Sequence, residues 1–110
     1  MSKLATLELT GKSGTKYTFD VYSYSSNFLK FGCVYCISKR ALNDENKFVH
    51  DIFYIGKTED MSIRISGHHK KECFEKNDPN CISIYKSESE EDRIRIEGDL
   101  IKYYEPTCND

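Results

Sequence analysis

The sequence predicts a small α/β protein of the α+β kind, with a central antiparallel β-sheet flanked by helices. Two observations predict this class. The first half of the chain alternates apolar and polar residues, as in the segment 17–24, which is typical of strands with one buried face. The second half contains two segments with helical start and stop signals. The connections between the early strands are too short for crossover helices, so we expect antiparallel pairing.

The length and composition indicate one compact domain. A chain of 110 residues, 38% hydrophobic and 31% charged, supports one core without disulfides or metal. No apolar run approaches the roughly 20 residues that cross a bilayer, so we expect no membrane partner. The first ten residues lack an apolar signal segment, which favours an intracellular, cytoplasmic location. The net charge of −2 gives no overall basic signature for nucleic-acid binding, although a local basic patch is compatible with it.

The first half of the chain is expected to be all β. Loose alternation on either side of the turn residues 11–14 predicts an N-terminal hairpin, and a third strand rich in β-forming residues follows a connector. A polar stretch then reads as an extended loop before a fourth strand. We expect the hairpin to extend the sheet and cover an edge strand rather than to bind a partner. The predicted hairpin strands, third strand, loop and fourth strand are 4–10, 17–24, 32–38, 39–47 and 48–56.

The second half is expected to hold two helices and one strand. Thr58 is a candidate N-cap for a helix that runs to about Phe74. The turn residues 77–80 end that helix, and the alternation in 81–86 predicts a strand. Ser87 is the candidate N-cap of a last helix, which should end near Tyr104, just before a proline.

Five cysteines are expected to be thiols that pack as small apolar groups. Cys33 and Cys36 have the spacing of a zinc or dithiol redox site. In a strand, however, residues three apart point to opposite faces and do not converge on one ion, so this is the least favoured interpretation. The five are Cys33, Cys36, Cys73, Cys81 and Cys108.

A carboxylate interrupts the apolar face of the last predicted helix. Ile94, Glu97, Ile101 and Tyr104 share one face by their spacing. Glu97 has two interpretations: it lies at the edge of that face and reaches water or an arginine, or it points into a cleft and holds a hard cation.

The first predicted helix places a guanidinium and an imidazole on one side. Met61, Arg64 and His68 follow at spacings of three and four. Alone, each would be ordinary. With Glu97 they supply a phosphate clamp, a proton carrier and a metal ligand, which is the set that phosphodiester chemistry needs.

These residues resemble the motifs of the GIY-YIG nuclease superfamily. The second motif of that family is intact, a helix with a correctly spaced arginine and histidine follows it, and the chain ends with a glutamate and a Pro-x-x-Asn element. The first motif departs, since Cys33-Val34-Tyr35 stands where Gly-Ile-Tyr is expected. The resemblance covers about residues 31–110 and leaves 1–30 as a hairpin extension of the single domain. The matching residues are Tyr54-Ile55-Gly56, Arg64, His68, Glu97 and Pro106 to Asn109.

The resemblance implies a divalent-metal-dependent DNA endonuclease that hydrolyses phosphodiester bonds. Glu97 would hold one Mg²⁺ or Mn²⁺ ion, and Arg64 would neutralise charge on the phosphate. Tyr35 would be the general base, although a tyrosine acts as a base near neutral pH only if nearby cations lower its pKa. Lys57 and Arg64 are the candidate cations.

The remaining site residues would have supporting roles. By the same resemblance, Tyr54 and His68 would orient water and phosphate or share the proton transfer. Gly56 and Asn109 would lie at the substrate, with Asn109 supporting the site through hydrogen bonds. The alternative is a module of the same fold that binds nucleic acid or a protein with little or no cleavage. A homodimer or a partner protein that supplies specificity is compatible with either function.

Overall fold

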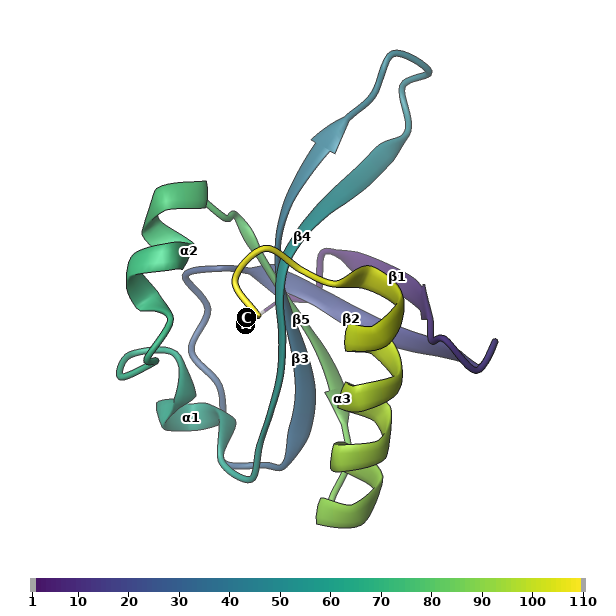
Figure 1. Cartoon of the computed structure of the whole chain (residues 1–110). Coiled ribbons are helices and arrows are strands. Elements are labelled where there is room, and N and C mark those ends of the chain that lie inside the picture. Colours follow the sequence, from purple (N-terminus) through teal and green to yellow (C-terminus); the bar gives the residue numbers. More distant parts are fainter. Residues whose placement is uncertain (1, 110) are drawn as a thin grey trace.

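The sheet contains five antiparallel strands, counted within residues 2–109, which the computed structural model describes. The strands are β1 (Ala5–Thr10), β2 (Lys16–Ser23), β3 (Cys33–Leu42), β4 (Phe48–Thr58) and β5 (Cys81–Lys86). Their order across the sheet is β1-β2-β5-β3-β4, so β3 lies between β5 and β4 (Figure 1). The α+β class and the antiparallel pairing are therefore confirmed.

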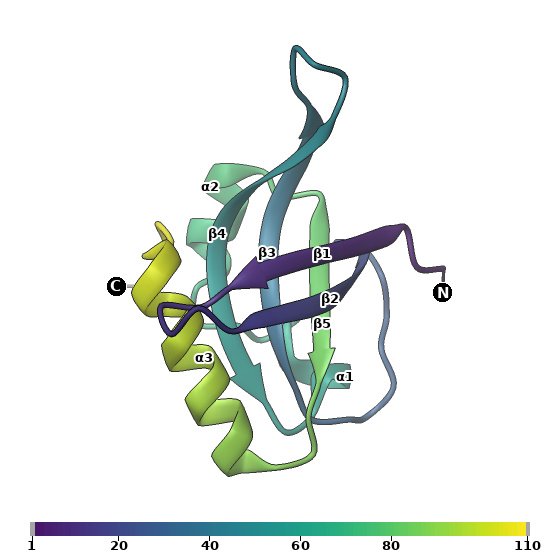
Figure 2. The ribbon, with the colours of Figure 1, turned by 90° about the vertical axis from the view of Figure 1, so that its right-hand side faces the viewer.

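Helices cover both faces of this sheet. They are α1 (Met61–Arg64), α2 (Lys71–Asn77) and α3 (Glu90–Tyr104). Figures 1 and 2 show α3 on one face and α1 with α2 on the other. Ser89 caps α3 by accepting a hydrogen bond from the Asp92 backbone N–H at 3.2 Å, so the cap lies two residues after the predicted Ser87. A left-handed Glu105 ends this helix, where the break was expected.

Alternation along β3 divides the interior into two cores. Cys33, Tyr35 and Ile37 pack on the side of α1 and α2, together with Met61 and Phe74. The residues between them pack on the side of α3. Because β3 is covered on both faces and both edges over this stretch, it forms the centre of the fold. The side chains of the second core are Leu9, Tyr17, Phe19, Val34, Cys36, Ile55, Ile96 and Leu100.

The same alternation separates the two cysteines that suggested a metal site. Cys33 lies in the core on the α1 and α2 side, and Cys36 lies in the core beneath α3. The expectation that they face opposite sides is confirmed, and Cys33 shares its face of β3 with Tyr35. Both thiols are buried and unpaired.

The N-terminal hairpin extends the sheet, as predicted. β1 pairs with β2, and β2 continues onto β5 with Asp20 opposite Ile84. Asp99 of α3 anchors the hairpin turn, because its carboxylate accepts hydrogen bonds from the Ser13 backbone N–H at 2.8 Å and the Tyr17 hydroxyl at 2.9 Å. The hairpin is thereby tied to α3 as well as to β5.

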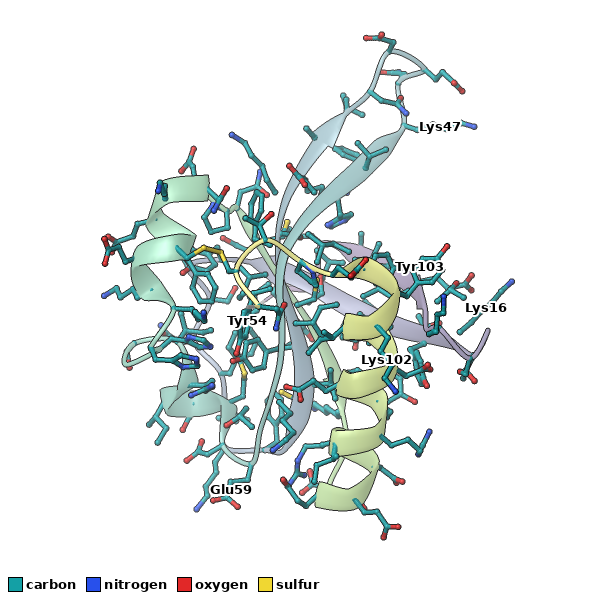
Figure 3. The ribbon with its side chains drawn as sticks, in the orientation of Figure 1. Lys16, Lys47, Tyr54, Glu59, Lys102 and Tyr103 are labelled. Atoms are coloured by element: carbon teal, nitrogen blue, oxygen red, sulfur yellow. A yellow bond between two sulfur atoms is a disulfide. The ribbon has the colours of Figure 1, made fainter. Side chains whose placement is uncertain are left out.

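The predicted loop 39–47 is too long, because β3 continues to Leu42 and only residues 43–47 form the connection to β4. The two strands continue past the body of the sheet and form a projecting two-stranded arm, with Lys47 near its tip (Figures 1 and 3). Asn43 closes the turn by accepting hydrogen bonds from the backbone N–H groups of Glu45 and Lys47. Neither face of the arm is covered by a helix, so its strands have no need of apolar alternation, which was the signal used to find strands.

The single helix predicted from Thr58 to Phe74 is also wrong. Two short helices stand in its place, and residues 65–70 between them are not helical. Asp60, rather than Thr58, caps α1 by accepting a hydrogen bond from the Ser62 backbone N–H at 3.0 Å. Ser66 and Gly67, which are exposed, are poor helix formers, so the helix is weak at this point and the hydrogen bonds of His68 can set the path of the chain.

The face assignment of α3 needs a correction of one position. Its buried residues are Arg93, Ile96 and Leu100, whereas Ile94 is 53% exposed. The apolar stripe expected through Ile94 and Glu97 is therefore rotated relative to the core. Glu97 lies at the border of the buried face.

The expectation that all five cysteines are thiols is wrong for two of them. Cys73 of α2 and Cys108 of the C-terminal segment form a disulfide, with a sequence separation of 35 residues. Spacing alone does not identify a pair, because the folded chain brings these two side chains together beside the edge strand β4.

Removing this disulfide should lower the free energy of unfolding by about 3–4 kcal/mol, because a cross-link over such a loop limits the entropy of the unfolded chain. The variant is Cys73→Ser with Cys108→Ser, compared with the parent chain by denaturant unfolding. As a control, the parent chain in reductant should unfold like the variant. Alkylation of all five cysteines in unreduced protein would contradict the prediction.

Candidate active site

The hydroxyl of Tyr35 is the centre of a polar cluster in the α1 and α2 core. Arg64 Nε donates a hydrogen bond to it at 2.9 Å, and His68 Nε2 lies 2.6 Å from it. Tyr35 is 0% exposed and His68 4%. Although α1 ends at Arg64, the non-helical turn that follows still brings His68 to the same hydroxyl. Arg64 and His68 therefore converge, as their spacing suggested, but on a tyrosine rather than on one helix face.

A backbone contact sets the tautomer of His68. The Lys70 backbone N–H donates to His68 Nδ1 at 2.9 Å, so Nδ1 accepts and the ring proton is assigned to Nε2. His68 Nε2 then donates to the Tyr35 oxygen. Burial, together with the charge of Arg64, lowers the pKa of His68 to about 4, so the imidazole is neutral near pH 7. The Tyr35 oxygen thus accepts two hydrogen bonds.

Two opposing effects act on the acidity of Tyr35. Burial raises its pKa well above the ordinary value, and the charge and hydrogen bond of Arg64 act in the opposite direction. Burial dominates, because the phenolate would lose its hydration in the core. Tyr35 is accordingly a protonated phenol near neutral pH in this structure.

Tyr54 lies beside this cluster. Its ring packs edge to face against His68 at 4.8 Å and against Phe74 at 5.4 Å, measured between ring centroids. Figure 3 shows Tyr54 among the side chains that fill the space between α2 and α3. Burial raises its pKa, while Arg64 lowers it through charge and hydrogen bonding. Arg64 therefore acts on both predicted tyrosines.

Gly56 allows the two tyrosine rings to share this position. A Cβ atom there would lie 2.6 Å from Cε2 of Tyr54 and 2.7 Å from Cζ of Tyr35. Such distances are too short for any side chain. The role of Gly56 in this structure is therefore to leave room for the rings.

Glu97 reaches the cluster from α3, at the edge of the sheet formed by β4. Burial raises the pKa of its carboxyl, and the positive charges of Lys57 and Arg64 oppose that rise. The negative charge of Glu97 in turn raises the pKa of Tyr54. The structure thus places Glu97 near enough to Arg64 and Tyr54 for their charges to influence one another, although these residues lie far from it in sequence.

Lys57 points toward α3. Its ammonium donates a hydrogen bond to Glu90 Oε1 at 2.8 Å, and Arg93 Nη2 binds the other oxygen of Glu90 at 2.9 Å. Of the two candidate cations, Arg64 is the one whose charge lowers the pKa of Tyr35. The charge of Lys57 acts instead on the carboxyl of Glu97.

Asn109 binds the backbone of β4. Its Oδ1 accepts from the Ile55 N–H at 2.9 Å, and its Nδ2 donates to the Ile55 carbonyl at 2.8 Å. The Cys108 N–H donates to the Phe53 carbonyl at 2.8 Å. The C-terminal segment thus pairs with the outer edge of β4 on both sides of Tyr54. Asn109 supports the strand that carries the site, in agreement with its expected hydrogen-bonding role.

A single carboxylate suits a magnesium ion that keeps most of its water. Glu97 is half-buried, and its carboxyl is influenced by Arg64 but not neutralised by a close ion pair within the described residues. Mg²⁺ is often held by one or two carboxylates together with waters and substrate phosphate. No cluster of three or more His, Cys, Asp or Glu side chains occurs in residues 2–109. Glu97 is the carboxylate of this cluster that could hold such an ion.

Sequence reasoning missed three contributors to the cluster. Phe74 packs against both Tyr54 and His68, and the ring of His69 stacks on that of His68. The Cys73–Cys108 disulfide joins α2 to the segment that holds β4. The adjacent histidines His68 and His69 were the one sequence feature that could have indicated a role for His69.

Comparisons of the chain with known protein families, curated proteins and solved structures give no match. None of the helices in residues 2–109 combines the length and the apolar character needed to cross a membrane.

The free energy of unfolding should fall as the pH drops from 6.5 to about 4, because His68 has a pKa of about 4 when folded and an ordinary value of 6.5 when unfolded. In that window the unfolded chain binds the additional proton, which favours unfolding by up to about 3 kcal/mol. Urea unfolding across this range, for the parent chain and His68→Gln, measures the effect. An identical pH dependence in both proteins would contradict it.

Proposed function

We propose that this protein is a divalent-metal-dependent endonuclease that hydrolyses phosphodiester bonds in DNA. The observation that carries the proposal is the convergence of Arg64 and His68 on the Tyr35 hydroxyl, with Tyr54 and Glu97 in the same cluster. A guanidinium, two phenols, a neutral imidazole and a carboxylate are the groups that phosphodiester hydrolysis uses.

The order of the elements adds support. From β3 to α3 the chain runs strand, strand, two helices, strand, helix, and the predicted first-motif strand lies between the other two strands of this part. The resemblance to the GIY-YIG superfamily expects paired strands carrying the two tyrosines. Here Tyr35 pairs with Gly56, and Ile37 pairs with Tyr54.

Arg64 is the proposed phosphate clamp. Its Nε is occupied by the Tyr35 hydroxyl, which holds the guanidinium in one orientation beside Tyr54 and Glu97. Fixed donors stabilise charge on a phosphoryl oxygen better than mobile ones, because they need no reorganisation during the reaction. Glu97 would hold the Mg²⁺ or Mn²⁺ ion, whose chemistry is to polarise the phosphate and stabilise the leaving oxygen.

Burial distinguishes the two tyrosines. Tyr35 is 0% exposed, whereas Tyr54 keeps 7% of its surface accessible. We assign the contact with the attacking water to Tyr54, and to Tyr35 the role of holding Arg64 and His68 in place. This differs from the expectation drawn from the resemblance, in which Tyr35 is the base.

The metal-nuclease function is tested by plasmid cleavage in Mg²⁺ or Mn²⁺. Glu97→Ala and Arg64→Ala should each lower the rate about 100-fold or more, because each removes a group that stabilises transition-state charge. Glu91→Ala and Arg95→Ala, at exposed positions of α3, are matched controls that should retain full activity. Absence of cleavage, or full activity of Glu97→Ala, contradicts the proposal.

Cleavage should accelerate as the pH rises from neutral into the alkaline range. Burial raises the pKa of Tyr54, so the fraction of phenolate grows with pH throughout that range. Single-turnover rates as a function of pH are compared for the parent chain, Tyr54→Phe and Tyr35→Phe. Tyr54→Phe should remove the alkaline increase, and Tyr35→Phe should lower the rate but keep the slope. If Tyr35→Phe removes the alkaline increase and Tyr54→Phe keeps it, the general base is Tyr35.

The alternative is a nucleic-acid-binding or protein-binding module of the same architecture. The complete burial of Tyr35 favours it, because a covered hydroxyl does not contact water or phosphate in this conformation. Fluorescence anisotropy of Glu97→Ala with labelled DNA separates binding from cleavage. DNA affinity that falls with salt, without cleavage by the parent chain, identifies a DNA-binding module.

A further inference from the structure

The ring of His69 continues the aromatic cluster of the site to the protein surface. It stacks on the ring of His68 with centroids 4.7 Å apart and planes 13° apart. It also meets the edge of Tyr54 at 6.4 Å. His68 and Tyr54 are buried, whereas His69 is exposed. The ring of His69 is therefore an exposed extension of the proposed catalytic cluster.

The position of His69 is set by the break between α1 and α2. The His68 N–H donates to the Ile65 carbonyl at 3.2 Å, and the Lys71 N–H donates to the His68 carbonyl at 3.1 Å. These contacts turn the chain so that His68 points inward, and the next ring lies flat against it. The exposed ring of His69 is held in one orientation by stacking on the buried ring of His68, so it offers a preformed flat surface to a ligand.

A shallow hollow of about 320 Å³ lies beside this ring. Two ammonium groups and one carboxylate surround it, and the disulfide-bonded Cys73 forms part of its wall. The net charge of these lining residues is positive, which suits phosphate groups, and the ring of His69 offers a flat surface for a nucleobase. The lining residues are His69, Lys70, Glu72, Cys73 and Lys76.

We propose that His69 stacks an unpaired nucleobase next to the phosphate held by Arg64. This inference rests on the proposed nuclease function and specifies its substrate as single-stranded or locally unpaired DNA. In a duplex both faces of a base are covered by its neighbours, so an aromatic surface of this kind binds only a base that has left the stack. His68 links the two sites, since it contacts the Tyr35 hydroxyl on one side and the ring of His69 on the other.

The test is metal-free binding of an oligonucleotide that contains 2-aminopurine, whose fluorescence is quenched by stacking. The same labelled strand is used alone and in a fully paired duplex. His69→Ala should weaken single-strand binding about 5- to 100-fold and reduce the change in fluorescence, because one base–aromatic stack is lost. His69→Phe should restore both, and duplex binding should not change.

Ser66→Ala is the matched control, because Ser66 is exposed in the same segment and carries no ring. It should bind both forms of DNA as the parent chain does. Unchanged single-strand affinity in His69→Ala overturns the inference, as does an equal loss for single strand and duplex, which would indicate a general charge or folding effect. Failure of the parent chain to bind the single strand also overturns it.

The two proposals fail in different experiments. If the parent chain cleaves plasmid DNA but His69→Ala binds the single strand normally, the stacking site is wrong and the nuclease stands. If His69→Ala loses single-strand binding and His69→Phe regains it without any cleavage by the parent chain, the stacking site stands and the nuclease is wrong.

Discussion

A buried phenol must have its hydrogen bonds satisfied, and in this protein that constraint organises the site. Tyr35 lies on the central strand and is covered by helices, so its oxygen depends on Arg64 and His68 as donors, and its own O–H has Tyr54 as a hydrogen-bonding neighbour. An unsatisfied hydroxyl at this depth would cost about 1–3 kcal/mol. The hydrogen bonds from Arg64 and His68 to this hydroxyl fix the positions of α1 and of the turn after it. Both segments carry groups that we propose for catalysis.

The C-terminal segment supports the same cluster from the other side. The side-chain amide of Asn109 bonds to the N–H and the carbonyl of Ile55, as a neighbouring strand would at that position of the β4 edge. The disulfide beside it connects this segment to α2, whose Phe74 packs against Tyr54 and His68. The edge strand that carries Tyr54, one of the proposed catalytic groups, is thereby held without further sheet pairing.

Sequence patterns predicted the parts of the fold that have one buried face or a clear stop. The hairpin, the strand Cys81–Lys86 and the end of α3 were predicted to within two residues. The β3 half of the arm, residues 39–42, was missed because both faces of the arm are exposed, so periodicity carries no signal there. The helix break after Arg64 was missed because weak local propensity at residues 66 and 67 does not decide it alone; the hydrogen bonds of His68 also fix it, and no local pattern predicts them.

By itself the sequence determined the antiparallel α+β class and the opposite faces of Cys33 and Cys36, and it singled out Tyr35, Arg64 and His68, which meet in the structure. Strand alternation and local spacing are sufficient for these. Only the tertiary structure decided that Tyr35 is fully buried, that Cys73 bonds to Cys108, and that His69 stacks outside His68. Each of these depends on contacts between segments distant in sequence, which no local pattern records.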